Sequence, residues 1–102
     1  MLLTIDIGNT NITLGAYQGE TLQFESRMET NRFRMEDQYA IELRDIIDLY
    51  GFSPAQFEGA IICSVVPALT SVIARAVEKL VGKAGVHVYN LGTGNGYSVL
   101  QV

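Results

Sequence analysis

The sequence predicts an α/β domain built on a mixed β-sheet that carries helices on its faces. The first 28 residues contain three short segments with the apolar pattern of strands, separated by turns that contain glycine. Two later segments repeat their apolar residues at helical spacing, and each is followed by a further apolar segment of strand length. The predicted order of elements is therefore β-β-β-α-β-α-β.

An antiparallel meander of three strands is expected at the N-terminus. The first strand, residues 2–7, is mostly apolar, which is typical of a central strand. Residues 12–17 alternate as a half-buried strand does, and Gly19 marks a tight turn after them. The third strand, residues 21–28, places every second residue on the buried face: Leu22, Phe24, Ser26 and Met28.

A helix near residues 35–50 follows the meander, and a second strand region follows the helix. Gly51 fits the position just after the last turn of this helix. The buried positions of the helix recur at helical spacing and are Tyr39, Leu43, Ile46, Ile47 and Tyr50. Ser53 and Pro54 then begin a short turn. Residues 60–66 form a continuous apolar run, which is typical of a strand covered on both faces.

The second helix is expected to begin at Pro67 and to end near Val81, with Gly82 closing it. Its buried stripe contains Leu69, Val72, Ile73, Ala76, Val77 and Leu80. A strand at 86–89, a loop LGTGNG and a last strand segment at 97–100 complete the chain. This order of elements is the layout of the ribonuclease-H-like domain found in actin, Hsp70 and sugar kinases, also called the actin-like ATPase domain.

Composition limits the classes of function. The chain has 102 residues, enough for one domain, with 48% hydrophobic and 18% charged residues. A net charge of −4 gives no electrostatic footprint for nucleic acid or an anionic membrane. No apolar run is long enough to span a bilayer, and Asp6 interrupts the N-terminal apolar stretch where a signal peptide would be uniform. We therefore expect a cytoplasmic protein with no nucleic-acid or membrane partner.

Two residues with chemically versatile side chains are expected to have structural roles. Cys63 is the only cysteine, so no disulfide framework or cysteine metal site exists, and its apolar strand predicts a small buried hydrophobic residue. His87 has no second ligand nearby in sequence, which favours a structural or surface histidine.

The segment DIGNTN, residues 6–11, is the strongest functional candidate. A glycine and small polar residues between two strands can aim backbone N–H groups at an anion, and Asn9, Thr10 and Asn11 add side-chain donors. Asp6 would repel a phosphate directly, but it can act through Mg²⁺ or a metal-bound water. A Walker A loop and a dinucleotide fingerprint are excluded, because no Gly-Lys-Ser/Thr or following helix is present. A plain β-turn whose amides bond Asp6 remains the alternative.

Several segments resemble those of the type III pantothenate kinases, a family of the actin-like ATPase (ASKHA) superfamily. DIGNTN resembles the first phosphate motif of the family, and ETNRFRMEDQY at 29–39 resembles its threonine-arginine segment before the first helix. IICSVVPALT at 61–70 resembles its serine-valine-valine-proline stretch. Gly96 and Tyr97 are similar to a glycine-tyrosine pair that many members carry shortly before their catalytic motif.

The resemblance implies ATP-dependent phosphorylation of pantothenate to 4′-phosphopantothenate, the first step of coenzyme A biosynthesis. It implies Mg²⁺, a monovalent cation (K⁺ or NH₄⁺) and a homodimer. It also implies that Tyr97 contacts pantothenate, while Thr13 stands where many members carry lysine. The residues that would bind the ATP phosphates are Asp6, Ile7, Gly8, Asn9, Thr10, Asn11, Ile12 and Thr13.

The catalytic motif of the family, glycine-x-aspartate-arginine, does not occur in the 102 residues. Its aspartate is expected just after Val102, and residues 1–102 are expected to be the N-terminal domain, without the second actin-like domain and inactive alone. Three other aspartates fit the solvated face of the first helix: Asp37, Asp45 and Asp48.

Two alternatives from other classes remain open, namely a transcriptional accessory factor of the Baf type and a nucleotide-binding regulatory module. The local basic cluster could contact a substrate or a partner subunit, although exposed charges near a strand end are usually only solvated: Arg27, Arg32 and Arg34.

Overall fold

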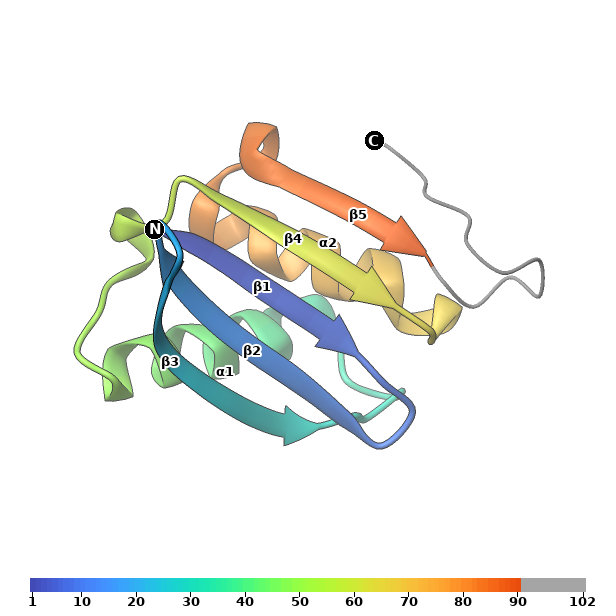
Figure 1. Ribbon diagram of the computed structural model, residues 1–102. Helices are drawn as coiled ribbons and strands as arrows, with labels where there is room; N and C mark the ends of the chain where they lie inside the picture. Colours follow the sequence, from blue (N-terminus) through green and yellow to red (C-terminus); the bar gives the residue numbers. More distant parts are fainter. Residues whose placement is uncertain (91–102) are drawn as a thin grey trace.

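A five-stranded sheet and two helices form two layers in the computed structural model, which describes residues 1–90 (Figure 1). The ribonuclease-H-like class is confirmed: the sheet is mixed, and the order of the described elements follows the prediction. The expected LGTGNG loop, Tyr97 and the strand segment at 97–100 lie outside the described residues.

The strands lie in the order β3-β2-β1-β4-β5 across the sheet. β1 (Leu2–Ile7), β2 (Asn11–Gln18) and β3 (Thr21–Glu29) form the predicted antiparallel meander. β4 (Gly59–Ser64) pairs in parallel with β1, and β5 (Val86–Asn90) pairs in parallel with β4. The carboxyl ends of β1, β4 and β5 therefore meet at one edge of the sheet.

The helices begin and end close to the predicted residues. α1 spans Glu36–Leu49 and α2 spans Pro67–Val81. Gly51 and Gly82 follow them with φ of 86° and 88°, a backbone conformation that side chains disfavour. Short 3₁₀ turns lie at Pro54–Gln56, capped by the Ser53 hydroxyl, and at Lys83–Gly85. Within residues 1–90, no helix is long and apolar enough to cross a membrane.

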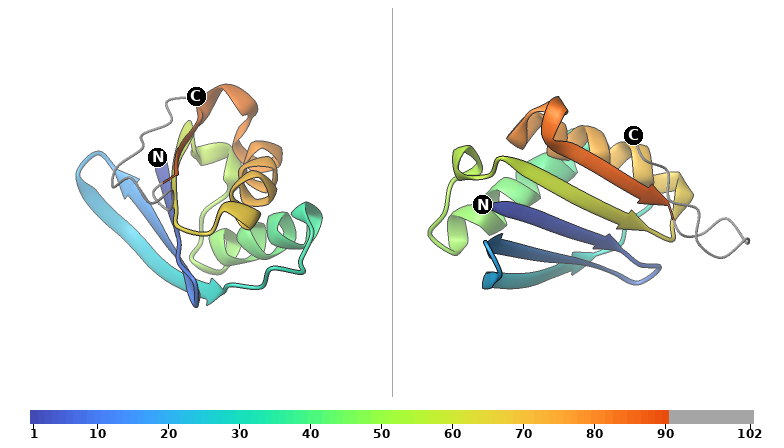
Figure 2. Two further views of the ribbon diagram at one scale, coloured as in Figure 1. Left: turned by 90° about the vertical axis from the view of Figure 1, so that its right-hand side faces the viewer. Right: turned by 45° about the horizontal axis from the view of Figure 1, so that its top comes forward.

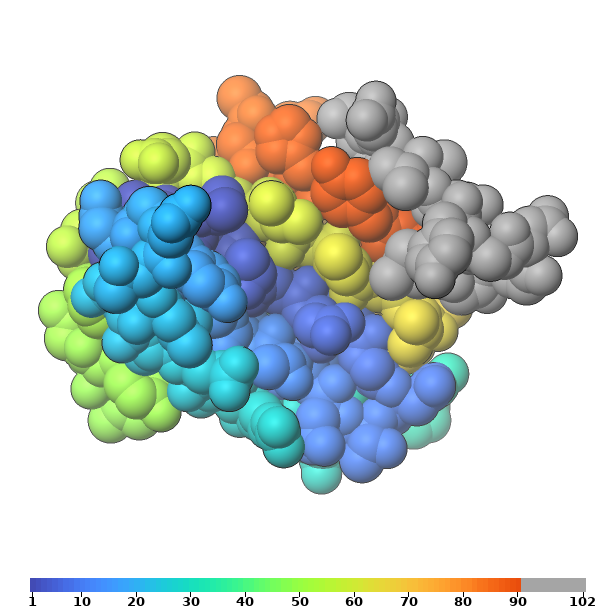
Figure 3. Space-filling view, viewed as in Figure 1, coloured from blue at the N-terminus to red at the C-terminus, as the bar shows by residue number. Residues whose placement is uncertain are grey.

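Both helices cover the same face of the sheet (Figure 2). The core lies between them and the strand residues that point towards them, which include Leu3, Ile5, Ile7, Ile12, Leu14, Ala60 and Ile62. No described helix lies in front of the other face, which we call the open face, and side chains of β1, β4 and β5 reach the surface there (Figure 3). The expectation of helices on both faces is therefore wrong for residues 1–90.

Residues 60–66 were expected to be buried on both faces, and the structure corrects this as well. β4 ends at Ser64, while Ile61 and Cys63 point to the open face and are only half-buried. Cys63 is thus not the fully buried hydrophobic residue that its apolar neighbours predict. His87 is exposed on the same face, in agreement with the prediction of a surface histidine.

A β-bulge changes the alternation of β3. Ala16 pairs with Phe24, but the next residue, Tyr17, pairs with Leu22, so Gln23 is an extra residue on β3. Leu22 consequently joins Tyr17 on the open face and is 45% exposed, whereas Phe24 is buried. The predicted inward position of Leu22 is wrong for this reason.

Candidate functional site

The loop that joins β1 to β2 lies at the carboxyl edge of the parallel strands, beside the end of β4 (Figure 1). Ligands of open α/β sheets bind at this edge because loops can converge there from several strands. The connection between β4 and α2 reaches the same place, since the Val65 N–H donates to the Ile7 carbonyl oxygen at 3.0 Å. DIGNTN and the predicted SVVP segment are therefore neighbours.

Asp6 lies one residue before the end of β1, and its side chain is exposed. Its cross-strand neighbours on the open face are Thr13 on β2 and Cys63 on β4. Ile7 and Ile12 point the opposite way and are completely buried in the core. Their side chains cannot reach a ligand, so only their main chain is available to the site.

The tip of the loop offers unpaired donors. The Gly8 N–H donates to the Asn11 carbonyl oxygen at 3.0 Å, while Asn9, Thr10 and Asn11 are exposed. Among residues 1–90, the main-chain N–H groups of Asn9 and Thr10 make no hydrogen bond to a protein acceptor. The expected alternative, a turn whose amides bond the Asp6 carboxylate, is not what the structure shows.

Gly8 is constrained by a close approach and not by its φ angle. No residue from Asp6 to Thr13 has a positive φ. A Cβ atom at Gly8 would meet the Asn11 carbonyl oxygen at 3.0 Å, tighter than ordinary packing allows. The turn is narrow here, and a larger residue would push its two sides apart.

Thr30, just after β3, holds the loop from behind. Its hydroxyl donates to the Gly8 carbonyl oxygen at 2.8 Å, and its N–H donates to the Thr10 carbonyl oxygen at 3.1 Å. The next residue, Asn31, is fixed by the buried Tyr39 of α1. The Tyr39 hydroxyl donates to the Asn31 carbonyl oxygen at 2.6 Å and accepts the Asn31 N–H at 3.0 Å.

The structure separates the three arginines of the basic cluster. Arg32 donates from Nη2 to the Asn9 Oδ1 at 3.0 Å, so it lies at the tip of the loop. Arg34 pairs with Glu42 of α1, and its guanidinium carbon lies 5.2 Å from the centre of the Tyr39 ring. Arg27 is exposed on β3, opposite Thr13.

The sequence alone singled out Arg32 only as part of a basic cluster, and it gave no role to Thr30 as an individual residue. The resemblance of the segment ETNRFRMEDQY was the one signal that pointed to this connection. Tyr39 was predicted as a core residue of the helix, which is correct, but the pattern does not reveal what its hydroxyl bonds.

Burial raises the pKa of the Cys63 thiol above its ordinary value, and the neighbouring Asp6 carboxylate raises it further. A thiolate beside a carboxylate is disfavoured, so Cys63 is a poor nucleophile at neutral pH.

Residues 1–90 contain no cluster of three or more carboxylate, histidine or cysteine side chains that would hold a metal by itself. Mg²⁺ does not need one, because it commonly binds one or two carboxylates together with substrate phosphates and water. An exposed carboxylate at Asp6, beside the Thr13 hydroxyl and the loop, suits such a shared site.

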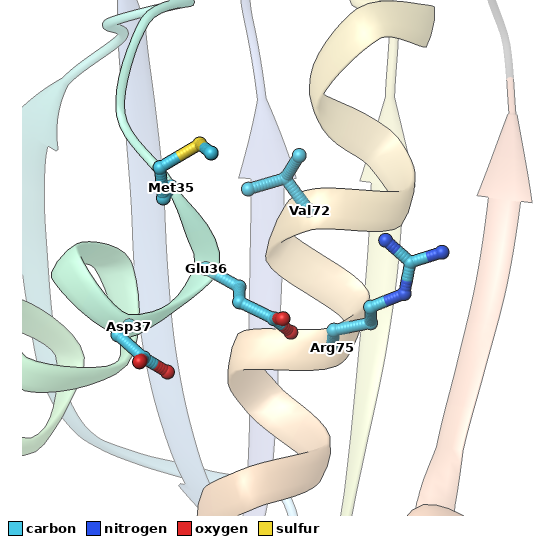
Figure 4. Close-up of a pocket in the computed structure, with 5 residues that line it drawn as sticks. All are labelled: Met35, Glu36, Asp37, Val72 and Arg75. Carbon is cyan, nitrogen blue, oxygen red and sulfur yellow. The ribbon is translucent and has the colours of Figure 1, made fainter.

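A separate groove of about 420 Å³ lies between α1 and α2 (Figure 4). The Glu36 side chain extends towards α2, while the Arg75 guanidinium points away from Glu36, and the other lining residues are Met35, Asp37 and Val72. None of the predicted site residues lines this groove. Asp37, Asp45 and Asp48 are exposed on α1, as expected for its solvated face.

Comparisons with known proteins agree with the resemblance of the motifs. A family model described as type III pantothenate kinase matches residues 2–99. The chain is 53% identical over 70 residues to the type III pantothenate kinase of Roseiflexus castenholzii (strain DSM 13941 / HLO8), covering 69% of the chain and 28% of the relative. It is 44% identical over 79 residues to that of Brevibacillus brevis (strain 47 / JCM 6285 / NBRC 100599), covering 78% of the chain and 31% of the relative.

The chain therefore spans less than a third of the length of these relatives. Among solved structures, the RuvC structure of Thermus thermophilus matches with a TM-score of 0.50 and 18% identity, covering 87% of this chain and 59% of that one. At this identity the match supports the ribonuclease-H-like fold and nothing further.

Proposed function

The chain belongs to the type III pantothenate kinase family, and from this membership we propose that it forms the ATP-phosphate-binding part of an enzyme that phosphorylates pantothenate. The product is 4′-phosphopantothenate, and the reaction is the first step of coenzyme A biosynthesis. One observation supports this proposal most directly: the exposed Asp6 carboxylate lies beside a turn in which the main-chain N–H groups of Asn9 and Thr10 make no hydrogen bond within residues 1–90.

Each part of the loop has a task in binding ATP. The main-chain N–H groups of Asn9 and Thr10 donate to phosphate oxygens. The side-chain hydroxyl of Thr10 and the side-chain amide of Asn11 are further donors. Gly8 keeps the turn narrow enough for a phosphate to approach the main chain. Thr13, on the open face beside Asp6, adds a hydroxyl at the position where the resemblance implies that many members carry lysine. Ile7 and Ile12 anchor the two sides of the turn in the core.

Asp6 would hold Mg²⁺, directly or through a bound water, and the ion when bound neutralises part of the phosphate charge. The main chain of Asp6 is held in place by β1, which is paired on both sides, so the strand that presents the carboxylate does not need to reorganise when the ligand binds. A requirement for K⁺ or NH₄⁺ is also proposed, on the resemblance to the family.

We further propose that residues 1–102 are the N-terminal domain of the enzyme, and that the catalytic aspartate and a second actin-like domain lie beyond them. The support is that the chain spans only 28% to 31% of the relatives' length and contains no glycine-x-aspartate-arginine motif. Without the proposed second domain, nothing would close the other side of the nucleotide cleft, so the chain alone could not orient two substrates and exclude water. The isolated chain is therefore expected to be inactive.

The remaining proposals concern the surroundings of the enzyme. The whole enzyme is proposed to be a cytoplasmic homodimer, with Tyr97, outside the described residues, contacting pantothenate. Nucleic acid is not expected as a partner, because the net charge of −4 would oppose binding to phosphate backbones. A membrane is not expected as a partner either.

The test is pantothenate-dependent release of ADP from ATP, with Mg²⁺ and K⁺ or NH₄⁺ present, on the 102-residue chain and on the longer gene product side by side. Activity of the longer product alone is the expected result. Saturable activity of the chain by itself would contradict the proposal of an incomplete site. Absence of activity in both would favour an accessory factor or a regulatory module instead.

A further inference from the structure

We propose that Arg32 is a phosphate-contacting residue of the ATP site, which extends the site beyond residues 6–13. This inference rests on the proposed function, because it assigns a further ligand-binding residue to the same loop. The starting observation is that the Arg32 Nη2 lies 3.0 Å from the Asn9 Oδ1, at the tip of the β1–β2 turn. The guanidinium therefore contacts the side chain of Asn9, a residue whose main-chain N–H makes no hydrogen bond within residues 1–90.

The main chain next to Arg32 is held firmly. Thr30 makes two hydrogen bonds to the turn, and Asn31 makes two to the buried hydroxyl of Tyr39. The Asn31 Oδ1 also accepts the Phe33 N–H at 2.9 Å. Together these bonds fix the main chain on both sides of Arg32, so the segment that carries its side chain needs no rearrangement when a ligand binds.

The charge of Arg32 is also available. Within residues 1–90 it makes no ion pair, and its side chain makes one hydrogen bond, to a neutral amide oxygen. A guanidinium has five N–H donors in a planar fork that matches phosphate oxygens, so most of its donors remain for a ligand. In a chain of net charge −4, an unpaired cation at the phosphate loop favours an anionic ligand there.

Arg34 provides a matched comparison on the same connection. It carries the same charge, but it pairs with Glu42 and lies over the Tyr39 ring, so its charge is already compensated by a carboxylate of the protein. Neutralising Arg34 changes the net charge as much as neutralising Arg32 does. A difference between the two variants therefore reports position and not total charge.

The binding test uses the 102-residue chain, labelled for NMR and titrated with Mg·ATP and with inorganic triphosphate. Shifts of the Gly8, Asn9 and Thr10 amides are expected with both ligands. Arg32→Gln should weaken binding of both by about tenfold, the loss of one charge-assisted hydrogen bond. Arg34→Gln should change it by less than about twofold, and Arg32→Lys, which keeps the charge without the fork, should lie between them.

Equal affinities of Arg32→Gln and Arg34→Gln would overturn the inference, and so would the absence of loop shifts with triphosphate in the unmodified chain. The longer gene product gives a separate reading, in which Arg32→Gln should raise the KM for ATP and leave that for pantothenate unchanged. If triphosphate binds at the loop in an Arg32-dependent way but no pantothenate-dependent ADP forms, the proposed function fails while the role of Arg32 stands.

Discussion

Asp6 and Cys63 are cross-strand neighbours on the open face, and the thiol therefore reports on the carboxylate. The Asp6 carboxylate contributes to the raised pKa of Cys63, after the larger contribution of burial. Because a nearby negative charge disfavours the thiolate, removing that charge lowers the thiol pKa and leaves more thiolate at a fixed neutral pH. A change at a proposed metal-binding residue thus becomes measurable as thiol chemistry.

We predict that Asp6→Asn makes Cys63 react severalfold faster with iodoacetamide at neutral pH, with the pH–rate profile displaced to lower pH. The measurement is the alkylation rate as a function of pH in the folded chain. Asp45→Asn removes an equal charge from the exposed surface of α1 and should leave the profile unchanged. Identical profiles for Asp6→Asn and the parent chain would contradict the assigned role of the carboxylate.

At this scale the sequence predicts residues with local signatures and misses residues with distant partners. Asp6 at the end of a strand, before a glycine turn, was readable directly from DIGNTN. Thr30 and Arg32 bond residues 22 and 23 positions away, and no periodicity or turn rule encodes such a contact. Their place in the site depends on the pairing of β2 with β3, which only the fold supplies.

The elements show how helix α1 serves the loop without touching it. Its 3.6-residue spacing places Tyr39 in the core, next to the layer made by Leu43 and Ile47. The ring is completely buried, but the hydroxyl reaches the connection after β3 and bonds both the N–H and the carbonyl oxygen of Asn31. One helical residue therefore packs against the sheet and also fixes the segment that holds the loop.

We predict that Tyr39→Phe lowers the free energy of unfolding by about 1–3 kcal/mol, because it removes the two hydrogen bonds between the hydroxyl and the Asn31 main chain while keeping the ring. Chemical denaturation of the two proteins measures this difference. Tyr50→Phe is the control, because Tyr50 is 44% exposed and stacks on Phe24 through its ring, so it should change stability little. Equal losses in the two variants would show that the Asn31 bonds carry no weight.

The boundaries of the helices were predictable because glycine, proline and apolar spacing mark them locally. α2 begins at Pro67 and ends at Val81, as expected, and Gly82 has the positive φ that such an end requires. The face assignment in β3 was only partly predictable. Its alternation is interrupted by the bulge at Gln23, which depends on how β2 and β3 pair and leaves no mark in the sequence of β3.

For the whole molecule, one apolar layer carries the stability of the fold. Ile5 lies in the central strand, between Leu14 of β2 and Ile62 of β4, and all three are buried beneath the helices. A close-packed interior cannot relax fully around a missing side chain, so truncation here costs both the lost burial and the cavity that remains. The β1–β2 loop begins at Gly8, three residues after Ile5, and depends on the same layer.

We predict that Ile5→Ala destabilises the chain by about 2–5 kcal/mol. Thermal and chemical unfolding monitored by circular dichroism measure the loss. Ile41→Ala removes the same atoms from a side chain that is 51% exposed on α1, and it should cost less than about 1 kcal/mol. A similar loss at both positions would mean that the layer between sheet and helices is not the main source of stability.

The class and order of the fold were predictable, but the placement of its layers was not. Segments of strand length that alternate with segments of helical spacing are compatible with few folds. In one of these, the strand after each helix lies parallel to an earlier strand of the same sheet. A continuous apolar run such as residues 60–66 shows that both faces of a strand are apolar. It does not show what covers each face, and in residues 1–90 both helices lie on the same one.

The residues that contact the β1–β2 loop lie close to it in the sequence, which has a consequence for folding while the chain is being synthesised. The hydrogen bonds to Gly8, Asn9 and Thr10 come from residues 11 to 32, and the support from α1 comes from Tyr39. All of these partners leave the ribosome before β4 does, and Gly59 of β4 pairs with Leu2 across 57 positions. Until β4 arrives, β1 has β2 as its one neighbouring strand in the described sheet. The contacts that shape the β1–β2 loop thus form within the first segment to emerge, while the sheet that supports them is completed by strands that arrive later.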